Sequence, residues 1–213
     1  MKLYTYFRSS AAYRVRIALN IKGLSYESVA RQLARGEQRA SDYLALNPQG
    51  LVPLLVDGDT AISQSLAIIE YLEETHPEPP LLPASTAERA LVRSLALAIA
   101  CDIHPLNNLR VLNYLRGPMA QSDAAVNAWY RHWLAAGLQA LEVQAARVPS
   151  DGQHLLGSQV TLADICLVPQ LYNARRFECD LAPYPRLTKV GAHLETLSAF
   201  SRAAPAVQPD AAA

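Results

Sequence analysis

Two adjacent serines, Ser9 and Ser10, lie where a run of strand-forming residues gives way to a helical pattern. Backbone N–H groups at a helix start have no partner inside the helix, and the helix dipole favours a negative charge there. A thiolate bound at this position would be stabilised, and a hydrogen bond from a serine hydroxyl to its sulfur would lower the thiol pKa further. A serine that only caps the helix explains the same two residues, and their adjacency leaves open which one would contact a sulfur.

A second polar pair, Gln64 and Ser65, directly precedes the apolar helical run LAIIEYL. A carboxylate could bind at this helix start through backbone N–H groups and the Ser65 hydroxyl, although an ordinary N-cap has the same sequence. Upstream, Pro53 follows Val52 where a strand is expected. Pro53 is either a trans proline on an edge strand or a cis proline that turns the backbone outward and frees Val52 to pair with a peptide. Two such helix starts and an X-Pro step in one small domain favour a binding site over unconnected caps.

Polar residues also interrupt a later helix that is otherwise rich in alanine and leucine. The segment CDIHPLNNLRVL places His104, Asn108 and Arg110 within two helical turns. A guanidinium group such as that of Arg110 can hold a carboxylate through two parallel hydrogen bonds. A solvated helix surface on which a neighbour satisfies His104 explains the segment equally well. Near the end of another helix, Arg175 and Arg176 have the charge that complements a C-terminal dipole.

The bulk composition excludes several kinds of partner. Lysine and arginine total 19, as do aspartate and glutamate, so the net charge is zero and no nucleic acid partner is expected. The N-terminal MKLYTYFRSS lacks the apolar core of a secretory signal, and no later run is apolar enough to span a bilayer, which indicates a soluble intracellular protein. Three widely spaced cysteines, Cys101, Cys166 and Cys179, indicate reduced thiols rather than disulfides or a zinc site.

The first part of the chain alternates strand and helix patterns. Leu3–Phe7 is rich in aromatic and strand-favouring residues, and the helix that follows it ends at Gly23. Within that helix, Arg14, Arg16 and Lys22 are expected to form the charged face. The order β-α-β-α-β-β-α predicts a compact α/β domain. The later elements are expected as strands within 24–30, at 52–56 and at 60–63, and helices within 31–46 and at 65–74.

A proline-rich stretch, HPEPPLLPAS at residues 76–85, separates this domain from a helical part. Pro105 is expected to kink or split the first helix beyond it. Thr161 and Asp164 have the spacing of a capping box, which we interpret as structural rather than chemical. The final PAVQPDAAA has the composition of a loose tail. The helices are expected from Ser85, over about 122–146 and over 161–177.

At these residues the sequence resembles the zeta class of glutathione transferases, a family that includes maleylacetoacetate and maleylpyruvate isomerases. The most specific part is the signature SSCxWRVRIAL of that class, which reads SSAAYRVRIAL here from Ser9 to Leu19. ALNPQGLVP, QSLAIIEYLEE, TLADICLVPQ and APYP support it, so the resemblance covers nearly the whole chain. It implies the glutathione transferase fold: an α/β thioredoxin-like domain over residues 1–78, a linker over 79–85 and an all-α, substrate-binding domain over 86–213. A homodimer is implied too.

The resemblance also implies roles for individual residues, with glutathione as the cofactor. Ser9 or Ser10 would lie near the glutathione sulfur, and Val52, beside a cis Pro53, would pair with the cysteinyl backbone. The residues implied to hold other parts of the tripeptide are Gln64 and Ser65 at its γ-glutamyl end, with Gln49, His104 and Asn108 nearby. The residues implied to bind a small diacid substrate are Arg8, Arg110 and Arg176.

The sequence departs from the signature at two positions, where Ala11 replaces its cysteine and Tyr13 its tryptophan. No protein thiol remains in the motif, so the expected nucleophile is the glutathione thiol itself. We expect a cytoplasmic isomerase that converts maleylacetoacetate to fumarylacetoacetate, with maleylpyruvate as the close alternative substrate. A conjugating or haloacid-processing glutathione transferase and a glutathione-binding protein without catalysis are the remaining alternatives.

Overall fold

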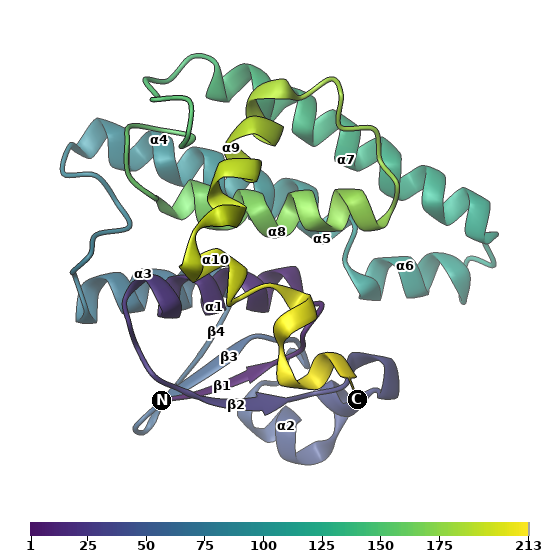
Figure 1. Cartoon of the computed structure of the whole chain (residues 1–213). Helices are drawn as coiled ribbons and strands as arrows, with labels where there is room; N and C mark the ends of the chain where they lie inside the picture. The colour runs from purple at the N-terminus through teal and green to yellow at the C-terminus, as the bar shows by residue number, and fades with distance from the viewer. Residues whose placement is uncertain (213) are drawn as a thin grey trace. The chain divides into compact units, whose positions relative to one another are not determined.

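The structure, a computed structural model, describes residues 1–212. The chain forms two compact units, whose elements are labelled in Figure 1. The first unit comprises residues 1–80 together with the C-terminal stretch that begins at Thr196, and the second comprises residues 81–195. Among the described residues, no helix is long and apolar enough to cross a membrane.

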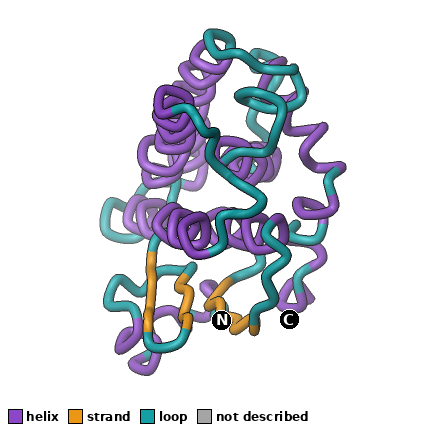
Figure 2. Tube along the Cα trace, turned by 90° about the vertical axis from the view of Figure 1, so that its left-hand side faces the viewer, coloured by secondary structure: helices purple, strands orange, loops and turns teal. Residues whose placement is uncertain are grey.

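The first unit is built around a four-stranded mixed sheet (Figure 2). Its elements are β1 Lys2–Thr5, α1 Ser10–Ile21, β2 Glu27–Ala30, α2 Ser41–Leu46, β3 Leu54–Asp57, β4 Thr60–Ser63 and α3 Ser65–Thr75. The strand order is β2-β1-β3-β4, in which β1 pairs parallel with β2 and antiparallel with β3. Helices α1 and α3 lie on one side of the sheet and α2 on the other (Figure 1). The predicted order of elements and the thioredoxin-like fold are therefore confirmed.

The core of this unit lies between the sheet and the helices that cover it. Leu3 of β1 and Leu55 of β3 are partners in the antiparallel ladder, and both are fully buried. From α1, the side chains of Val15, Ile17 and Leu19 are fully buried as well. Burial of each such side chain contributes about 1.5–3 kcal/mol, so apolar packing is a main source of the stability of this unit.

The charged residues of α1 and of its C-cap do not form the separate charged face that the helical pattern had indicated. Arg14, Arg16 and Lys22 are all buried. Arg16 donates to the Thr5 hydroxyl and to three main-chain carbonyls, and Lys22 donates to Glu73 at 2.8 Å and to two carbonyls beyond α3. Burial lowers the pKa of Arg16 to about 10, which leaves it charged at neutral pH. These oxygen partners replace the water that each charge loses.

The second unit is helical, as predicted. Its elements are α4 Thr86–Leu97, a π-helical segment Ala98–Ile103, α5 His104–Leu106, α6 Leu109–Arg116, α7 Asp123–Ala145, α8 Leu162–Arg176 and α9 Pro185–Thr196. Within described residues 81–195, the only β contact is an isolated bridge between Ser150 and Gly157. Pro105 lies in α5, and the helix that began at Thr86 ends one residue later, which confirms the expected break.

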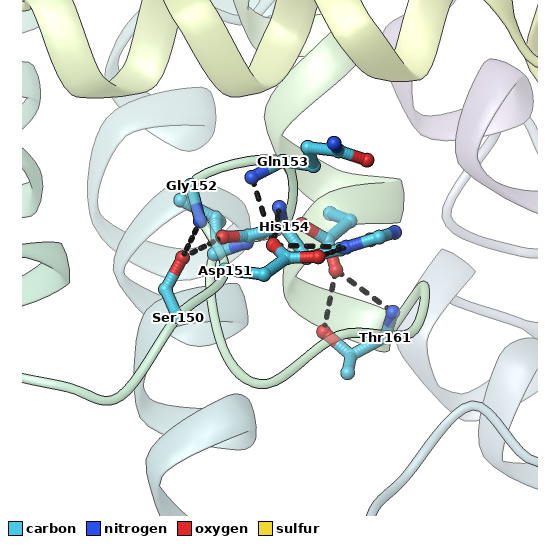
Figure 3. A network of polar contacts seen from close by, with 8 residues as sticks. Ser150, Asp151, Gly152, Gln153, His154 and Thr161 are labelled. Atoms are coloured by element: carbon cyan, nitrogen blue, oxygen red, sulfur yellow. Dashed lines mark hydrogen bonds and ion pairs between the residues drawn. The ribbon is translucent and has the colours of Figure 1, made fainter.

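The start of α8 is held by the predicted capping box. The Asp164 carboxylate accepts hydrogen bonds from the Thr161 N–H at 2.8 Å and from the Thr161 hydroxyl at 2.9 Å. Its other oxygen accepts from the Leu155 N–H at 2.8 Å, so the same side chain ties the preceding loop to the helix. Thr161 and the loop residues around His154 are drawn in Figure 3. The structural interpretation of this motif therefore accounts for all of its contacts.

Replacing Asp164 with alanine is expected to lower the free energy of unfolding by about 2–3 kcal/mol, because it removes a cap and leaves buried N–H groups of Thr161 and Leu155 without an acceptor. Urea denaturation would measure the change. The control is Ser122→Ala at the exposed start of α7, where the hydroxyl accepts from Ala125 N–H and the expected loss is about 1 kcal/mol. Equal losses in the two variants would contradict the role given to the buried carboxylate.

The C-terminal residues up to 212 do not form a loose tail, so that expectation was wrong for the part of the chain that the structure describes. After the short helix α10, Ser198–Ser201, the chain makes 3₁₀ turns at Pro205–Val207 and Pro209–Ala212. Asp210 is buried, and its carboxylate accepts a hydrogen bond from the Phe7 N–H at 2.8 Å. The composition of the tail could not reveal this contact because the two residues are 203 positions apart.

Candidate functional site

Ser9 and Ser10 have different positions at the start of α1. Ser9 is the N-cap, with an extended backbone, and its hydroxyl oxygen accepts from the Ala12 N–H at 3.2 Å. Ser10 is the first helical residue and is 4% exposed. A hydroxyl that accepts a hydrogen bond still has its own proton to donate. Ser9 can therefore cap the helix and donate to an anion at the same time, so the two explanations offered by the sequence are compatible.

Arg8 lies directly before this cap and is held by aromatic neighbours. Its Nη2 and Nε donate to the Tyr6 hydroxyl at 3.0 and 3.3 Å. Its guanidinium carbon is 5.1 Å from the centroid of the Phe7 ring, within the range of a cation–π contact. The Arg8 side chain is nevertheless exposed, so a positive charge is available next to Ser9.

The bond between Val52 and Pro53 is cis, as one of the two alternatives from the sequence required. Both residues are buried, and β3 begins immediately after them at Leu54. The antiparallel ladder between β1 and β3 likewise begins at Leu54, opposite Tyr4. The Val52 backbone thus lies just before the ladder. The role that the resemblance implies for it is to pair with the backbone of a peptide ligand.

The start of α3 gathers polar groups from three segments. The Gln64 side chain donates to Gln49 at 2.9 Å between its Nε2 and the Oε1 of Gln49, so two of the predicted binding residues are in contact. Ser65 opens the helix and is buried, and its hydroxyl accepts from Arg14 at 3.3 Å. Arg14 was missed as a site residue because the helical pattern placed it on a charged face. Its positive charge, the helix dipole and the Ser65 hydroxyl together suit a carboxylate.

Gln64 has an unusual backbone, with φ at 73° and ψ at 118°. Residues with a Cβ rarely adopt this conformation, which costs about 1–3 kcal/mol and occurs mainly at functional sites. The side chain is exposed, so packing does not explain why glutamine is present there. A strained, exposed residue at a helix start is consistent with selection for ligand contact.

Replacing Gln64 with glycine is expected to raise the free energy of unfolding by about 1 kcal/mol, because glycine relieves the positive φ at a smaller entropic cost. The same change should weaken binding of glutathione by removing the amide. Gln64→Ala is the matched control, since it also removes the amide but keeps the Cβ and its strain. Urea denaturation and titration calorimetry would measure both effects, and an alanine variant as stable as the glycine variant would refute the assigned strain.

In the second unit, the structure brings His104 and Asn108 together. The ring Nε2 of His104 is 3.4 Å from the Asn108 side-chain nitrogen, and the Asn108 oxygen caps α6 by accepting from the Arg110 N–H at 3.1 Å. The π-helical segment Ala98–Ile103 ends immediately before His104, and such segments are frequent at functional sites. Asn108 is therefore the N-cap of α6, and the side chain of Arg110, two residues later, is exposed.

The two arginines at the end of α8 have different environments. Arg175 forms an ion pair with Glu195 at 2.5 Å. Arg176 is exposed, has no ion-pair partner within residues 1–212, and lies with its guanidinium carbon 4.7 Å from the Phe177 ring centroid. Phe177 in turn stacks on Tyr130, with centroids 3.7 Å apart, and burial raises the pKa of that tyrosine so that it stays neutral. The positive charge of Arg176 is thus exposed to solvent, and its guanidinium group packs against the Phe177 ring.

Another polar cluster, in the loop before α8, resembles a catalytic dyad but does not have its geometry (Figure 3). The His154 Nδ1 is 3.0 Å from an Asp151 carboxylate oxygen. The Ser150 hydroxyl donates to the main-chain carbonyl of His154 rather than contacting its ring. Partial burial acts to raise the pKa of Asp151, but hydrogen bonds from Gln153 and His154 act in the opposite direction, and the pKa is lowered overall. The contacts of this cluster lie within residues 150–154 and stabilise the loop, and the Ser150 hydroxyl is not activated by the His154 ring.

Side chains that could bind a metal and the three cysteines are further candidates for chemistry. No group of three or more histidine, cysteine or acidic side chains within residues 1–212 could hold a metal ion. Cys101 is exposed, Cys166 is buried and Cys179 is partly buried. Burial raises the pKa of the Cys179 thiol, which disfavours its reactive form.

The chain is similar over its whole length to several known proteins. Residues 1–74 match the family model for the glutathione S-transferase N-terminal domain. A probable maleylacetoacetate isomerase of Vibrio cholerae is 53% identical, over 98% of this chain and 97% of the relative. A holo structure of maleyl pyruvate isomerase, a bacterial zeta-class glutathione S-transferase, is 50% identical over 99% of both chains, with a TM-score of 0.96. A maleylacetoacetate isomerase from Methylobacterium extorquens, solved with malonate and glutathione, is 42% identical over the full length of both chains, also with a TM-score of 0.96.

Proposed function

The chain belongs to the zeta class of glutathione transferases, and on that basis we propose that it catalyses the glutathione-dependent cis–trans isomerisation of a maleyl diketo acid. The observation that carries the proposal is the start of α1, where the hydroxyl of Ser9 caps the helix and retains a proton for a sulfur anion. The related isomerase was solved with glutathione and malonate, which is a dicarboxylate. This supports the proposal that the present chain binds glutathione and a diacid substrate.

The residues of the first unit fit a thiol tripeptide. We assign Ser9, rather than Ser10, to the glutathione sulfur, because Ser10 is buried inside the first helical turn. The N-terminus of α1 adds unpaired N–H groups and a positive dipole end, which lower the pKa of a bound thiol. The residues assigned to the peptide backbone and the γ-glutamyl end are Val52, Pro53, Gln49, Gln64 and Ser65.

Arginines are assigned to the diacid. Arg8, Arg110 and Arg176 are exposed, and their planar guanidinium groups match carboxylates in two-bond geometry. We place His104 and Asn108 near the tripeptide, as the resemblance implies. With the substrate fixed in this way, the arginines also stabilise negative charge that develops on its carbonyl oxygen.

Bound glutathione supplies a thiolate that adds to the cis double bond and leaves again after rotation, so it is regenerated. Ser9 stabilises the sulfur anion on arrival and on departure by donating its hydroxyl proton in a hydrogen bond. Arg8, Arg110 and Arg176 hold the carboxylates while the central bond turns. The chain needs no cysteine of its own, which fits Ala11 in the signature.

We propose maleylacetoacetate as the preferred substrate and maleylpyruvate as the alternative. The 53% identical relative is a probable maleylacetoacetate isomerase, and the 50% identical structure is a maleyl pyruvate isomerase. We further propose a homodimer that works in the cytoplasm, where glutathione is kept reduced.

The test is a direct assay of both substrates with purified protein. The ultraviolet spectrum follows conversion of maleylacetoacetate and maleylpyruvate to their fumaryl isomers with and without glutathione. We expect many turnovers per glutathione molecule and no conversion above background without it. A protein that isomerises neither substrate, or one that consumes glutathione stoichiometrically in a conjugate, would overturn the proposal.

A further inference from the structure

The C-terminal segment lies alongside α1 within the first unit (Figure 1, yellow). Asn20, near the end of the helix, donates to the Ala199 carbonyl at 2.9 Å. One turn earlier, Arg16 donates to the Ala203 carbonyl at 3.1 Å. The segment therefore runs antiparallel to α1 and reaches the residues that precede the helix.

At that end, Asp210 contacts the peptide that leads into the candidate site. Asp210 is 8% exposed, and its Oδ2 accepts from the Phe7 N–H at 2.8 Å. On the other side of the same residue, Arg16 donates to the Phe7 carbonyl at 3.0 Å and to the Tyr6 carbonyl at 3.4 Å. Two buried charged side chains thus hold the backbone around Phe7 from both sides, through charge-assisted hydrogen bonds.

The two charges also act on each other. Burial lowers the pKa of Arg16, while the nearby negative charge of Asp210 acts to raise it. Removing the Asp210 carboxylate would leave Arg16 with only neutral oxygen partners and the Phe7 N–H with no acceptor. A buried charge or donor that loses its partner is costly, so the backbone is expected to move to recover one.

The residues that would move are those assigned to chemistry. Phe7 is followed directly by Arg8 and Ser9, and the guanidinium group of Arg8 lies against the Phe7 ring. The Ser9 N–H donates to the Tyr6 carbonyl at 3.0 Å, which is the same oxygen that Arg16 contacts. A shift of the Phe7 peptide therefore changes the position of both Arg8 and Ser9.

We propose that Asp210 is a positioning residue of the isomerase, fixing Arg8 and Ser9 through the Phe7 peptide. This inference rests on the proposed function. It gives the C-terminal segment a part in the reaction, although Asp210 itself touches neither glutathione nor the diacid.

The experiment compares Asp210→Ala, Asp210→Asn and a control, Gln208→Ala, in the full-length protein. Gln208 lies on the same segment and donates to the Arg202 and Ala204 carbonyls, so its loss loosens the segment without touching Phe7. Asp210→Ala is expected to lower kcat by about tenfold or more, because small misplacements of catalytic groups have large kinetic effects. Asparagine keeps an acceptor oxygen and should recover part of that loss, and Gln208→Ala should stay within about twofold of the parent.

A second readout is the pH at which bound glutathione becomes a thiolate, followed by its ultraviolet absorbance. Relative to the parent protein, that pH should be higher in Asp210→Ala and unchanged in Gln208→Ala. In Asp210→Asn it should lie between the values of the parent and of Asp210→Ala. Unchanged kcat and thiolate titration in Asp210→Ala, with only a lower melting temperature, would overturn the proposal. If the parent protein isomerises neither diacid, the proposed function fails, and the thiolate titration still decides the role of Asp210. A parent protein that forms no bound thiolate at all would overturn both.

Discussion

Replacing Ser9 with alanine is expected to lower the turnover of the isomerisation by about 10²–10³-fold, the effect typical of losing one preorganised donor to a developing anion. The Ser9 hydroxyl is the donor because it accepts from Ala12 N–H and retains its own proton. The pH at which turnover reaches half its maximum should also rise, because the thiolate loses a hydrogen bond. Steady-state kinetics across pH would measure both.

Two controls separate catalysis from helix capping. Ser9→Gly keeps most of the capping energy, since glycine at an N-cap costs only a few tenths of a kcal/mol, yet it also lacks the hydroxyl. It should therefore lose about as much turnover as alanine. Ser10→Ala changes a buried residue of the first turn and should retain most activity. A larger loss at Ser10 than at Ser9 would transfer the role to Ser10.

Replacing Arg176 with alanine is expected to reduce turnover by about 100-fold while changing the glutathione KM by less than about threefold, because charge-assisted bonds to a carboxylate are worth about 1.5–3 kcal/mol each. The exposed guanidinium group lies against Phe177 and has no ion-pair partner in the described part of the chain. Lysine at this position should recover only part of the loss, because an ammonium group lacks the planar fork. Initial rates over a range of both ligands would give the two constants.

The neighbouring Arg175 is the matched control for this prediction. It has the same chemistry and is one residue away, but its charge is paired with Glu195. Arg175→Ala is expected to leave turnover within about twofold of the parent, because a partly exposed ion pair contributes about 0–1 kcal/mol to stability and nothing to the substrate. Equal losses from both substitutions, or an unchanged rate in Arg176→Ala, would remove Arg176 from the substrate site.

The features that the sequence predicted correctly depend on local chemistry. Helix α8 was expected over 161–177 and spans Leu162–Arg176, because capping residues and apolar spacing lie within the helix itself. The cis Pro53 was one of two local alternatives that a proline allows, and the resemblance rather than the local pattern pointed to it. Gln49 and Gln64 were linked only through the ligand that the resemblance implies, and their direct contact was not predicted. The assignment of roles to the site residues remains a prediction.

The features that were missed depend on partners far away along the chain. Helical periodicity separates charged from apolar residues, but it cannot show that Arg16 donates to the Ala203 carbonyl, 187 positions away along the chain. Nor can the composition of the C-terminal tail show that Asp210 meets the Phe7 N–H. The positive φ of Gln64 was invisible for a related reason, since side chains such as glutamine do not signal that conformation. Each of these features adjoins the candidate site, where local preference and structure are expected to disagree.

The central claim is that the glutathione sulfur, and not only glutathione binding, carries the reaction. S-methylglutathione keeps every peptide and carboxylate group of the cofactor but has no thiol to ionise. The decisive measurement is therefore the rate of maleylacetoacetate isomerisation with S-methylglutathione in place of glutathione. We predict no isomerisation above background, together with competitive inhibition when glutathione is added. Isomerisation at the glutathione rate with the methylated tripeptide would contradict the account.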